Sequence, residues 1–156
     1  FDPNFRHLLF PGDRSEFIRQ SKHFLQHCHF CKLSDEEAML IAEKSSVTEA
    51  IETLIELSNA VIAITMGKEG TLLCFQGQTY SIPSIPVNPV DTTGAGDAFV
   101  GAVLFQLSKY SVEEMNRLSL EQWQQITINA NKAGARTCEF MGAMEAFEHI
   151  THQIFQ

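Results

Sequence analysis

The 156-residue chain has no long apolar run and few basic residues. No stretch approaches the ~20 consecutive apolar residues of a membrane-spanning helix, so we expect no membrane partner. Eleven Lys and Arg stand against 19 Asp and Glu, a formal net charge of -8. This balance disfavours nucleic acid and anionic membrane surfaces, because their phosphates repel a negative protein. It also disfavours an anionic substrate such as ATP, unless the attraction is local and a metal ion assists it.

The chain also lacks the standard nucleotide-binding signatures. A dinucleotide fingerprint would need Gly or Ala three residues after Gly96, where Phe99 stands. A P-loop would need Lys directly after its glycine, but the first Lys after Gly96 is Lys109. The His-Arg-Asp and Asp-Phe-Gly sequences of protein kinases are absent as well.

The most informative segment is residues 91–99, Asp-Thr-Thr-Gly-Ala-Gly-Asp-Ala-Phe. Gly94, Ala95 and Gly96 let the backbone approach a ligand, and their N–H groups can point at an anion where a helix begins. A phosphate would repel the Asp97 carboxylate, which suits it better to take a proton from an attacking hydroxyl. In the alternative interpretation the glycines only shape a turn and Asp97 only caps the helix.

The four cysteines suggest reduced thiols in a cytoplasmic protein. Cys28 and Cys31, with His27 nearby, have the spacing of zinc ligands. We expect this segment to be a strand, in which the two thiols would point to opposite faces and lie ~10 Å apart. That geometry, together with the lack of a second ligand pair at the spacing of a zinc finger, disfavours a structural metal.

Hydrophobic patterning predicts strands that alternate with helices, and therefore a single α/β domain with a parallel sheet and right-handed crossovers. Ser34 with Glu37, and Ser46 with Glu49, form two capping-box patterns. The expected helices cover 13–26, 34–44, 46–57 and 98–107, then a short one after Ser111, a long one with Trp123, Ile126, Ala130 and Ala133 on one face, and a terminal one marked by Phe147, Ile150 and Ile154. The expected strands are 28–33 and 60–65, followed by a hairpin over 71–75 and 79–82. The helix over 98–107 is apolar on nearly every side and should be buried.

Residues 91–99 resemble the C-terminal signature of the ribokinase-like (PfkB) carbohydrate kinases. Four more segments resemble family motifs in the family's order: 1–6, 32–37, 65–70 and 131–143. The resemblance implies a three-layer α/β sandwich with a mostly parallel central sheet. Because members are longer and the matches belong to their C-terminal half, we expect 1–156 to be the C-terminal portion of one kinase domain. The N-terminal portion and the lid would be absent, and the isolated fragment inactive.

The resemblance implies ATP-dependent phosphorylation of a small sugar, with fructokinase as the leading interpretation. The alternatives are a kinase of another sugar or nucleoside, of the ribokinase or ketodeoxygluconate kinase type, and a catalytically silent nucleotide-binding fragment. Asp97 would be the general base, and the N–H groups of Gly94, Ala95 and Gly96 the anion hole. We also expect the cytoplasm as the compartment and a homodimer when the protein is full length.

The resemblance also assigns cofactor and metal residues. The proposed nucleotide and substrate set is Thr65, Gly67 and Gly70 at the phosphates, Asn131 at the adenosine, and Asn4 and Arg6 at substrate or phosphate. Glu37, with Ser34, would place Mg²⁺ through water, unless the two form only a capping box. A K⁺ site would use the Asp91 carboxylate and main-chain carbonyls, and the matching positions are Asp91, Thr93, Thr137, Phe140, Gly142 and Ala146. Alternatively, Asp91 only anchors its turn.

Overall fold

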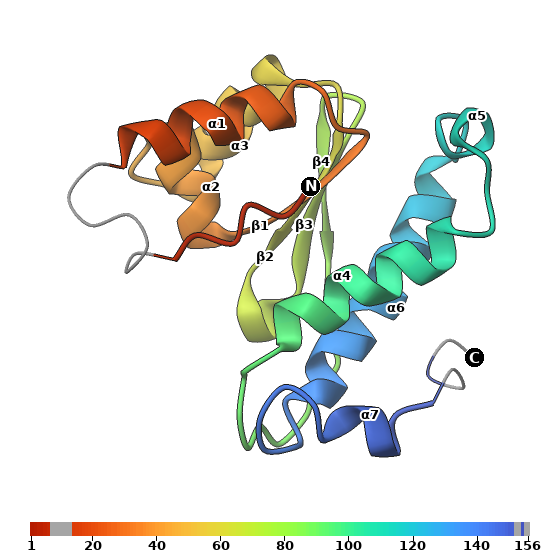
Figure 1. Ribbon diagram of the computed structural model, residues 1–156. Helices are drawn as coiled ribbons and strands as arrows, with labels where there is room; N and C mark the ends of the chain where they lie inside the picture. Colours follow the sequence, from red (N-terminus) through yellow and green to blue (C-terminus); the bar gives the residue numbers. More distant parts are fainter. Residues whose placement is uncertain (7–13, 152–153, 155–156) are drawn as a thin grey trace. The chain divides into compact units, whose positions relative to one another are not determined.

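The computed structural model describes residues 1–6, 14–151 and 154. The chain forms two compact units (Figure 1). The first unit comprises residues 1–66 and 72–80, and the second comprises 67–71 and 81–156. Within the described residues, no helix has the length and apolar character needed to cross a membrane.

The sheet has four strands in the order β1 (Phe30–Ser34), β2 (Val61–Thr65), β3 (Thr71–Phe75) and β4 (Gln78–Ile82). β1 and β2 are parallel, with Cys31 opposite Ile62. β3 and β4 form the predicted hairpin, whose turn residues Gln76 and Gly77 both have positive φ. Two such residues match the twist of a tight hairpin. The α/β prediction is confirmed, and within this chain the sheet is mixed, partly parallel.

Three helices of the first unit lie on one face of the sheet: α1 (Ser15–Leu25), α2 (Asp35–Ala42) and α3 (Val47–Leu57) (Figure 1). Leu25, Leu33, Ile41, Leu54 and Ile62 form the centre of their core. The predicted boundaries hold to within a few residues, and α2 and α3 each begin at a serine whose side chain caps the helix.

The caps of α2 and α3 differ. The Ser34–Glu37 capping box forms completely, with both reciprocal hydrogen bonds. Ser46 accepts from the Glu49 amide, but the Glu49 carboxylate accepts from the Ser46 hydroxyl at 2.8 Å. The second predicted box is therefore incomplete.

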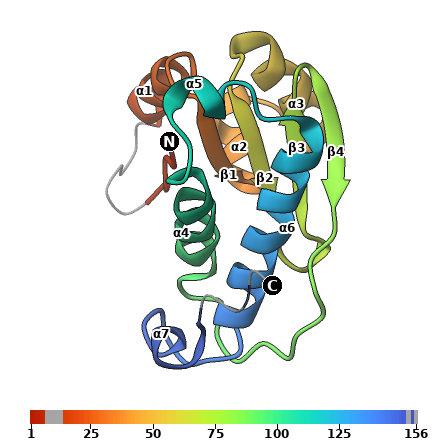
Figure 2. The ribbon, with the colours of Figure 1, turned by 90° about the vertical axis from the view of Figure 1, so that its right-hand side faces the viewer.

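In the second unit, α4 (Ala95–Leu107) runs alongside α6 (Leu120–Thr137) (Figure 2). Trp123, Ile126 and Ala130 on α6 are buried, as predicted. A Cβ at Gly134 would lie 3.0 Å from the Ala95 carbonyl oxygen, so the small residue allows α6 to approach the start of α4 closely. The remaining elements of this unit are short: η1 (Gly67–Glu69), α5 (Val112–Met115) and α7 (Ala146–His149).

Two helix predictions are wrong. α4 is not buried on every side, because Leu104 and Phe105 are 58% and 48% exposed. Its apolar residues surround the helix, whereas α6 covers only one face. The terminal helix ends at His149; Ile150 is extended and Phe147 is 70% exposed. The spacing of the apolar residues there does not mark one buried helical face.

The strand predicted over 28–33 begins two residues later than expected, after Cys28. β1 begins only at Phe30, and a bend at His29 precedes it. Because Cys28 lies before the strand, the alternation of a regular strand does not apply to the pair. The Cys28 thiol instead donates to the Leu25 oxygen at 3.5 Å, and the Cys31 thiol donates to the Lys32 oxygen at 3.8 Å.

Candidate functional site

The first turn of α4 carries the backbone donors of the predicted anion hole. Gly94 is the N-cap, with a φ of 83°. The Ala95 N–H donates to the Thr92 oxygen at 3.2 Å, so it is engaged in the turn and differs from the prediction. In the part of the chain that the structure describes, the N–H groups of Gly96 and Asp97 have no acceptor. Unpaired donors at a helix N-terminus favour an anion.

Only glycine fits at position 94. Its φ is positive, and a Cβ there would lie 2.8 Å from the Ala143 Cβ and 2.9 Å from the Ala143 Cα. The turn therefore packs directly on the loop that follows α6. This contact explains physically why the sequence has glycine at the start of the helix.

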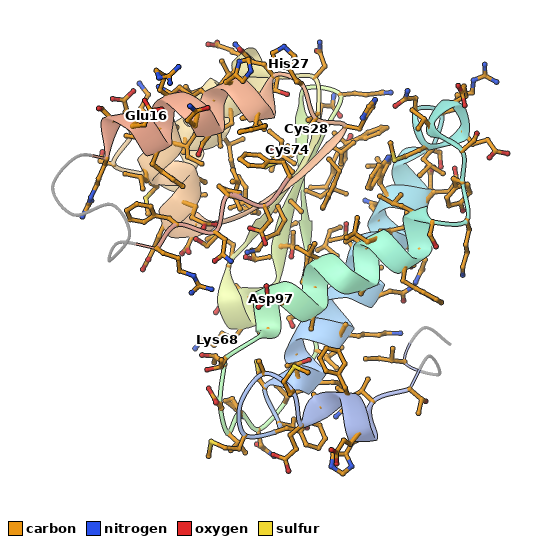
Figure 3. The ribbon with its side chains drawn as sticks, viewed as in Figure 1. Glu16, His27, Cys28, Lys68, Cys74 and Asp97 are labelled. Carbon is orange, nitrogen blue, oxygen red and sulfur yellow. The ribbon has the colours of Figure 1, made fainter. Side chains whose placement is uncertain are left out.

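Asp97 is an exposed residue in the first turn of α4 (Figure 3). Its carboxylate makes no hydrogen bond or ion pair with the described residues, and α4 has no side-chain cap. Asp97 is therefore not the N-cap of α4. A carboxylate here is stabilised by the positive end of the helix dipole and is free to accept a proton.

The Asp91 carboxylate joins two loops. One oxygen accepts from the Thr93 N–H at 2.9 Å and the Thr93 hydroxyl at 2.7 Å. The other accepts from the Gly142 N–H at 2.8 Å. The hydrogen bonds from Thr93, and then that from Gly142, hold the pKa of Asp91 below its ordinary value. Asp91 therefore does anchor its turn, as the alternative interpretation proposed.

The other residues of the predicted cation site follow along the end of α6 and the loop after it. The Thr137 carbonyl accepts from the Phe140 N–H at 3.2 Å, and the Thr137 hydroxyl donates to the Ala133 oxygen. Ala146 is buried at the start of α7. Of the predicted residues, the structure connects Thr93 and Gly142 to the Asp91 carboxylate by hydrogen bonds.

Asn131 is held inside the second unit by its own side chain. Its amide nitrogen donates to the oxygens of Ile82 at 3.0 Å and Pro83 at 3.3 Å, and its amide oxygen accepts from the Thr71 hydroxyl at 2.6 Å. With 6% exposure, it fastens α6 to the segments around it. The sequence predicted a place against adenosine, but these bonds favour a structural role.

Two glycines of the predicted phosphate segment differ in what they require. Gly70 has a φ of 103°, and a Cβ there would lie 2.2 Å from the Ile82 oxygen. Gly67, with a φ of 56°, faces open space. Gly70 is therefore needed for close backbone packing, whereas Gly67 is needed only for its backbone conformation.

In the first unit, the Glu37 carboxylate holds three segments together. One oxygen accepts from the Phe5 N–H at 2.7 Å and the other from the Ser34 N–H at 2.8 Å. Asn4 beside it has a positive φ of 49°, and Arg6 is exposed. At the end of β2, the Thr65 hydroxyl donates to the Leu33 oxygen at 3.2 Å. Glu37 thus positions the segment that carries Asn4 and Arg6.

Sequence reasoning missed the pair of Lys32 and Asp2. Lys32 is only 8% exposed, and its ammonium lies 3.6 Å from the Asp2 carboxylate. The Lys32 N–H also donates to the Phe1 oxygen, so residues 1 and 2 run beside β1. The available signal was a lysine inside an otherwise apolar strand, since a buried lysine requires a partner.

The chain is similar to solved structures of sugar and riboside kinases. The aminoimidazole riboside kinase from Salmonella enterica, solved with aminoimidazole riboside and an ATP analog, has a TM-score of 0.81 at 32% identity, covering 94% of this chain and 47% of that one. A fructokinase double mutant from Vibrio cholerae, in a fructose-, ADP- and potassium-bound form, has a TM-score of 0.82 at 26% identity, covering 94% of this chain and 46% of that one.

The chain belongs to the pfkB family of carbohydrate kinases, whose domain matches residues 1–148. A fructokinase from Escherichia coli is 36% identical over 149 residues, covering 94% of this chain and 46% of the relative. The chain thus spans about half the length of that relative. The family prediction made from the five motifs is confirmed.

Proposed function

We propose that the protein containing this chain transfers the terminal phosphoryl group of ATP to a hydroxyl of a small sugar. The observation that carries the proposal is the start of α4, where unpaired N–H groups stand beside an exposed, unengaged carboxylate. Phosphoryl transfer needs such donors for the charge on the transferring group and a base for the attacking hydroxyl. The relatives that are named fructokinase support the reaction class.

Each group at the start of α4 has one role in this reaction. The carboxylate of Asp97 accepts the proton of the sugar hydroxyl as that oxygen attacks the phosphorus atom. The N–H groups of Gly96 and Asp97, with the turn at Gly94, stabilise the negative charge on the phosphoryl oxygens. Glycine is required at position 94, because the packing of the turn on Ala143 leaves no room for a side chain. A larger residue would displace the turn and the N–H groups that follow it.

We assign Mg²⁺ to Glu37 through water. Both Glu37 oxygens already accept a backbone N–H, so the carboxylate suits a hydrated ion better than a directly bound one. When bound, Mg²⁺ would neutralise charge on the ATP phosphates. Thr65, Gly67 and Gly70 are proposed to border those phosphates. Asn131 would help to shape the adenosine pocket through its packing.

Fructose is the proposed acceptor, with Asn4 and Arg6 facing the substrate or its phosphate. The relatives include fructokinases from Vibrio alginolyticus and Escherichia coli, and a fructokinase from Vibrio cholerae was solved with fructose bound. Aminoimidazole riboside is the second candidate, because a riboside kinase of similar identity also matches. Fructose is a free sugar and aminoimidazole riboside is a ribose that carries an aminoimidazole group, but each offers a hydroxyl for phosphoryl transfer.

The test is a coupled ADP assay with the full-length protein over fructose, ribose, ketodeoxygluconate and aminoimidazole riboside. We expect fructose to give the highest kcat/KM. A higher value for the riboside would transfer the proposal to the second candidate. ADP production that does not rise with any of the four acceptors would contradict a kinase of these substrates.

We further propose that residues 1–156 are the C-terminal portion of one kinase domain in a cytoplasmic homodimer. The chain covers 46% of the fructokinases from Vibrio alginolyticus and Escherichia coli, which supports only the first part of this proposal, that residues 1–156 are a portion of a longer domain. The 156-residue chain alone should then bind ATP weakly and phosphorylate no sugar. The segments that hold ATP and the sugar in position for the reaction would be missing. Light scattering on the full-length protein tests the dimer, and sugar-dependent ADP production by the short chain would contradict its inactivity.

A further inference from the structure

The first residues of the chain are held beside β1 by backbone contacts at two points. The Phe1 amino group donates to the Phe30 oxygen at 2.8 Å, and the Lys32 N–H donates to the Phe1 oxygen at 3.0 Å. Two such bonds around one residue are the pattern of a parallel strand pair. Four residues further on, the Phe5 N–H donates to the Glu37 carboxylate at 2.7 Å. The backbone between these two points is therefore constrained from both sides.

Asn4 lies between the two points in a conformation that few residues adopt. Its φ of 49° belongs to the left-handed region, which is costly for a residue with a side chain. Such a conformation persists only where the surrounding structure holds it, and it is common at ligand sites. The contacts on either side of Asn4 therefore hold this turn and direct the side chains of Asn4 and Arg6.

One of these contacts is a buried ion pair between Lys32 and Asp2. Cys31 and Leu33 belong to the core of the first unit, so Lys32 between them points to the opposite face of the sheet. Lys32 is 8% exposed, and its ammonium lies 3.6 Å from the Asp2 carboxylate. A buried ammonium is costly unless an anion lies beside it. The position of Lys32 therefore fixes the position of the Asp2 side chain, two residues before Asn4.

We propose that Lys32 is a positioning residue for the acceptor sugar. Through its ion pair with Asp2, it holds the backbone that enters the turn at Asn4, and it thereby directs Asn4 and Arg6. This inference rests on the proposed function, in which those two side chains face the substrate or its phosphate. Lys32 acts through Asp2 and not by contact with the sugar.

A purely structural role of Lys32 has a different consequence. Loss of hydration offsets the attraction within a buried ion pair, so an uncharged pair of similar volume can hold a fold equally well. A lysine that only stabilises the fold would, when replaced, lower the folded fraction and therefore the apparent kcat. The KM would stay unchanged, because the molecules that remain folded bind the sugar as before. A positioning residue instead changes the KM of the folded molecules.

The experiment measures initial rates of the full-length protein at varied concentrations of the acceptor that the wild type prefers. Lys32→Met keeps the length of the side chain and removes its charge. The double variant Lys32→Met with Asp2→Asn also neutralises the carboxylate, so it should recover the melting temperature that the single variant loses. We expect both variants to raise the KM for the sugar by about tenfold or more. A double variant that melts like the wild type and keeps the wild-type KM would overturn the proposal.

Lys22 provides the matched control in the same unit. Its ammonium lies 2.5 Å from the Glu43 carboxylate, but the two side chains are 32% and 62% exposed. Solvent screens such a pair, so Lys22→Met should leave the KM and the melting temperature unchanged. A rise of the KM as large as that in Lys32→Met would show that the buried pair has no special role.

Hydrogen exchange gives a second readout that needs no substrate. In both Lys32 variants the Phe5 N–H should exchange about tenfold faster or more than in the wild type, because the segment that carries it opens more often. Lys22→Met should exchange like the wild type. Unchanged exchange in folded Lys32 variants would contradict the role of Lys32 alone. A wild-type protein that phosphorylates no acceptor would instead contradict the proposed function, and the exchange would still show whether Lys32 holds the segment.

Discussion

Asp97 is the residue for which the two interpretations differ most. A capping carboxylate would accept a hydrogen bond from the first turn of its helix, but the N-cap of α4 is Gly94, which has no side chain. The Asp97 carboxylate is exposed and makes no hydrogen bond with the described residues. Its place at the start of a helix therefore stabilises its charge without occupying its oxygens.

We predict that Asp97→Asn lowers kcat by a factor of ~10²–10⁴, because an amide cannot accept the proton of the sugar hydroxyl. The free energy of unfolding should change by less than ~1 kcal/mol, since no hydrogen bond is lost. ATP affinity should hold or increase, because a negative charge near the phosphates is removed. Turnover, thermal melting and ATP titration on the same variant measure the three quantities. A folded, ATP-binding variant that keeps more than about a tenth of kcat would exclude Asp97 as the base.

Glu37 can be tested as a metal residue separately from its role as a cap. Ser34→Ala removes one half of the capping box and should cost about 1 kcal/mol. Glu37→Gln keeps a capping-box residue but replaces one acceptor oxygen by a donor, and should cost about 1–3 kcal/mol. If Glu37 also places Mg²⁺, only Glu37→Gln should raise the Mg²⁺ concentration for half-maximal activity, by about tenfold or more. If both variants needed the same Mg²⁺ concentration for half-maximal activity, Glu37 would only cap α2 and accept the hydrogen bond from the Phe5 N–H.

At the scale of the element, the start of α4 depends on one backbone conformation. We predict that Gly94→Ala lowers the free energy of unfolding by about 2 kcal/mol or more, because it combines a positive φ with a clash against Ala143. The displaced turn should also lower kcat, since its N–H groups would no longer be held in place. Urea unfolding and turnover measure the two effects.

Gly101 provides the matched control on the same helix. It lies inside α4, its φ is not positive, and a Cβ there would meet no atom within 4 Å. Gly101→Ala should therefore stabilise the protein by about 0.5–1 kcal/mol through helix propensity. If Gly94→Ala were as harmless as Gly101→Ala, the close approach of the turn to Ala143 would not be essential.

At the scale of the whole molecule, we predict that the rate depends on the monovalent cation, because the Asp91 carboxylate joins the loop of Thr93 to the loop of Gly142. If the Asp91 carboxylate and neighbouring carbonyls hold K⁺, the full-length enzyme should be faster in K⁺ than in Na⁺ at constant ionic strength. Asp91→Ala should remove that difference. Initial rates in the two salts provide the measurement.

A control is needed because Asp91 also anchors its turn. Its carboxylate accepts from Thr93 and Gly142, so Asp91→Ala loosens two loops whether or not a cation binds. Thr93→Val removes only the hydroxyl bond and should keep the preference for K⁺. Equal wild-type rates in both salts would leave Asp91 as a turn anchor.

Features that depend on neighbours along the chain could be predicted from the sequence. The Ser34 cap of α2, the buried strand at β2 and the β3–β4 hairpin each depend on contacts within a few residues. The glycine turn before α4 could be predicted for the same reason, because an anion-binding helix start is a local arrangement. Five such local motifs in one order were also enough to predict the family that the sequence comparison confirms.

Contacts between distant segments could not be predicted in this way. Asn131 binds the Ile82 oxygen 49 residues away, and the Phe5 N–H binds Glu37 32 residues away. The exposure of Leu104 and Phe105 on α4 could not be predicted either. Helical periodicity shows which residues are apolar, but not which of them another helix covers. The sequence by itself determined most of the helices and strands, the hairpin turn and the family, because these follow from local hydrogen bonding and hydrophobic period. Only the tertiary structure decided which polar side chains are already occupied, because their partners come from distant parts of the chain.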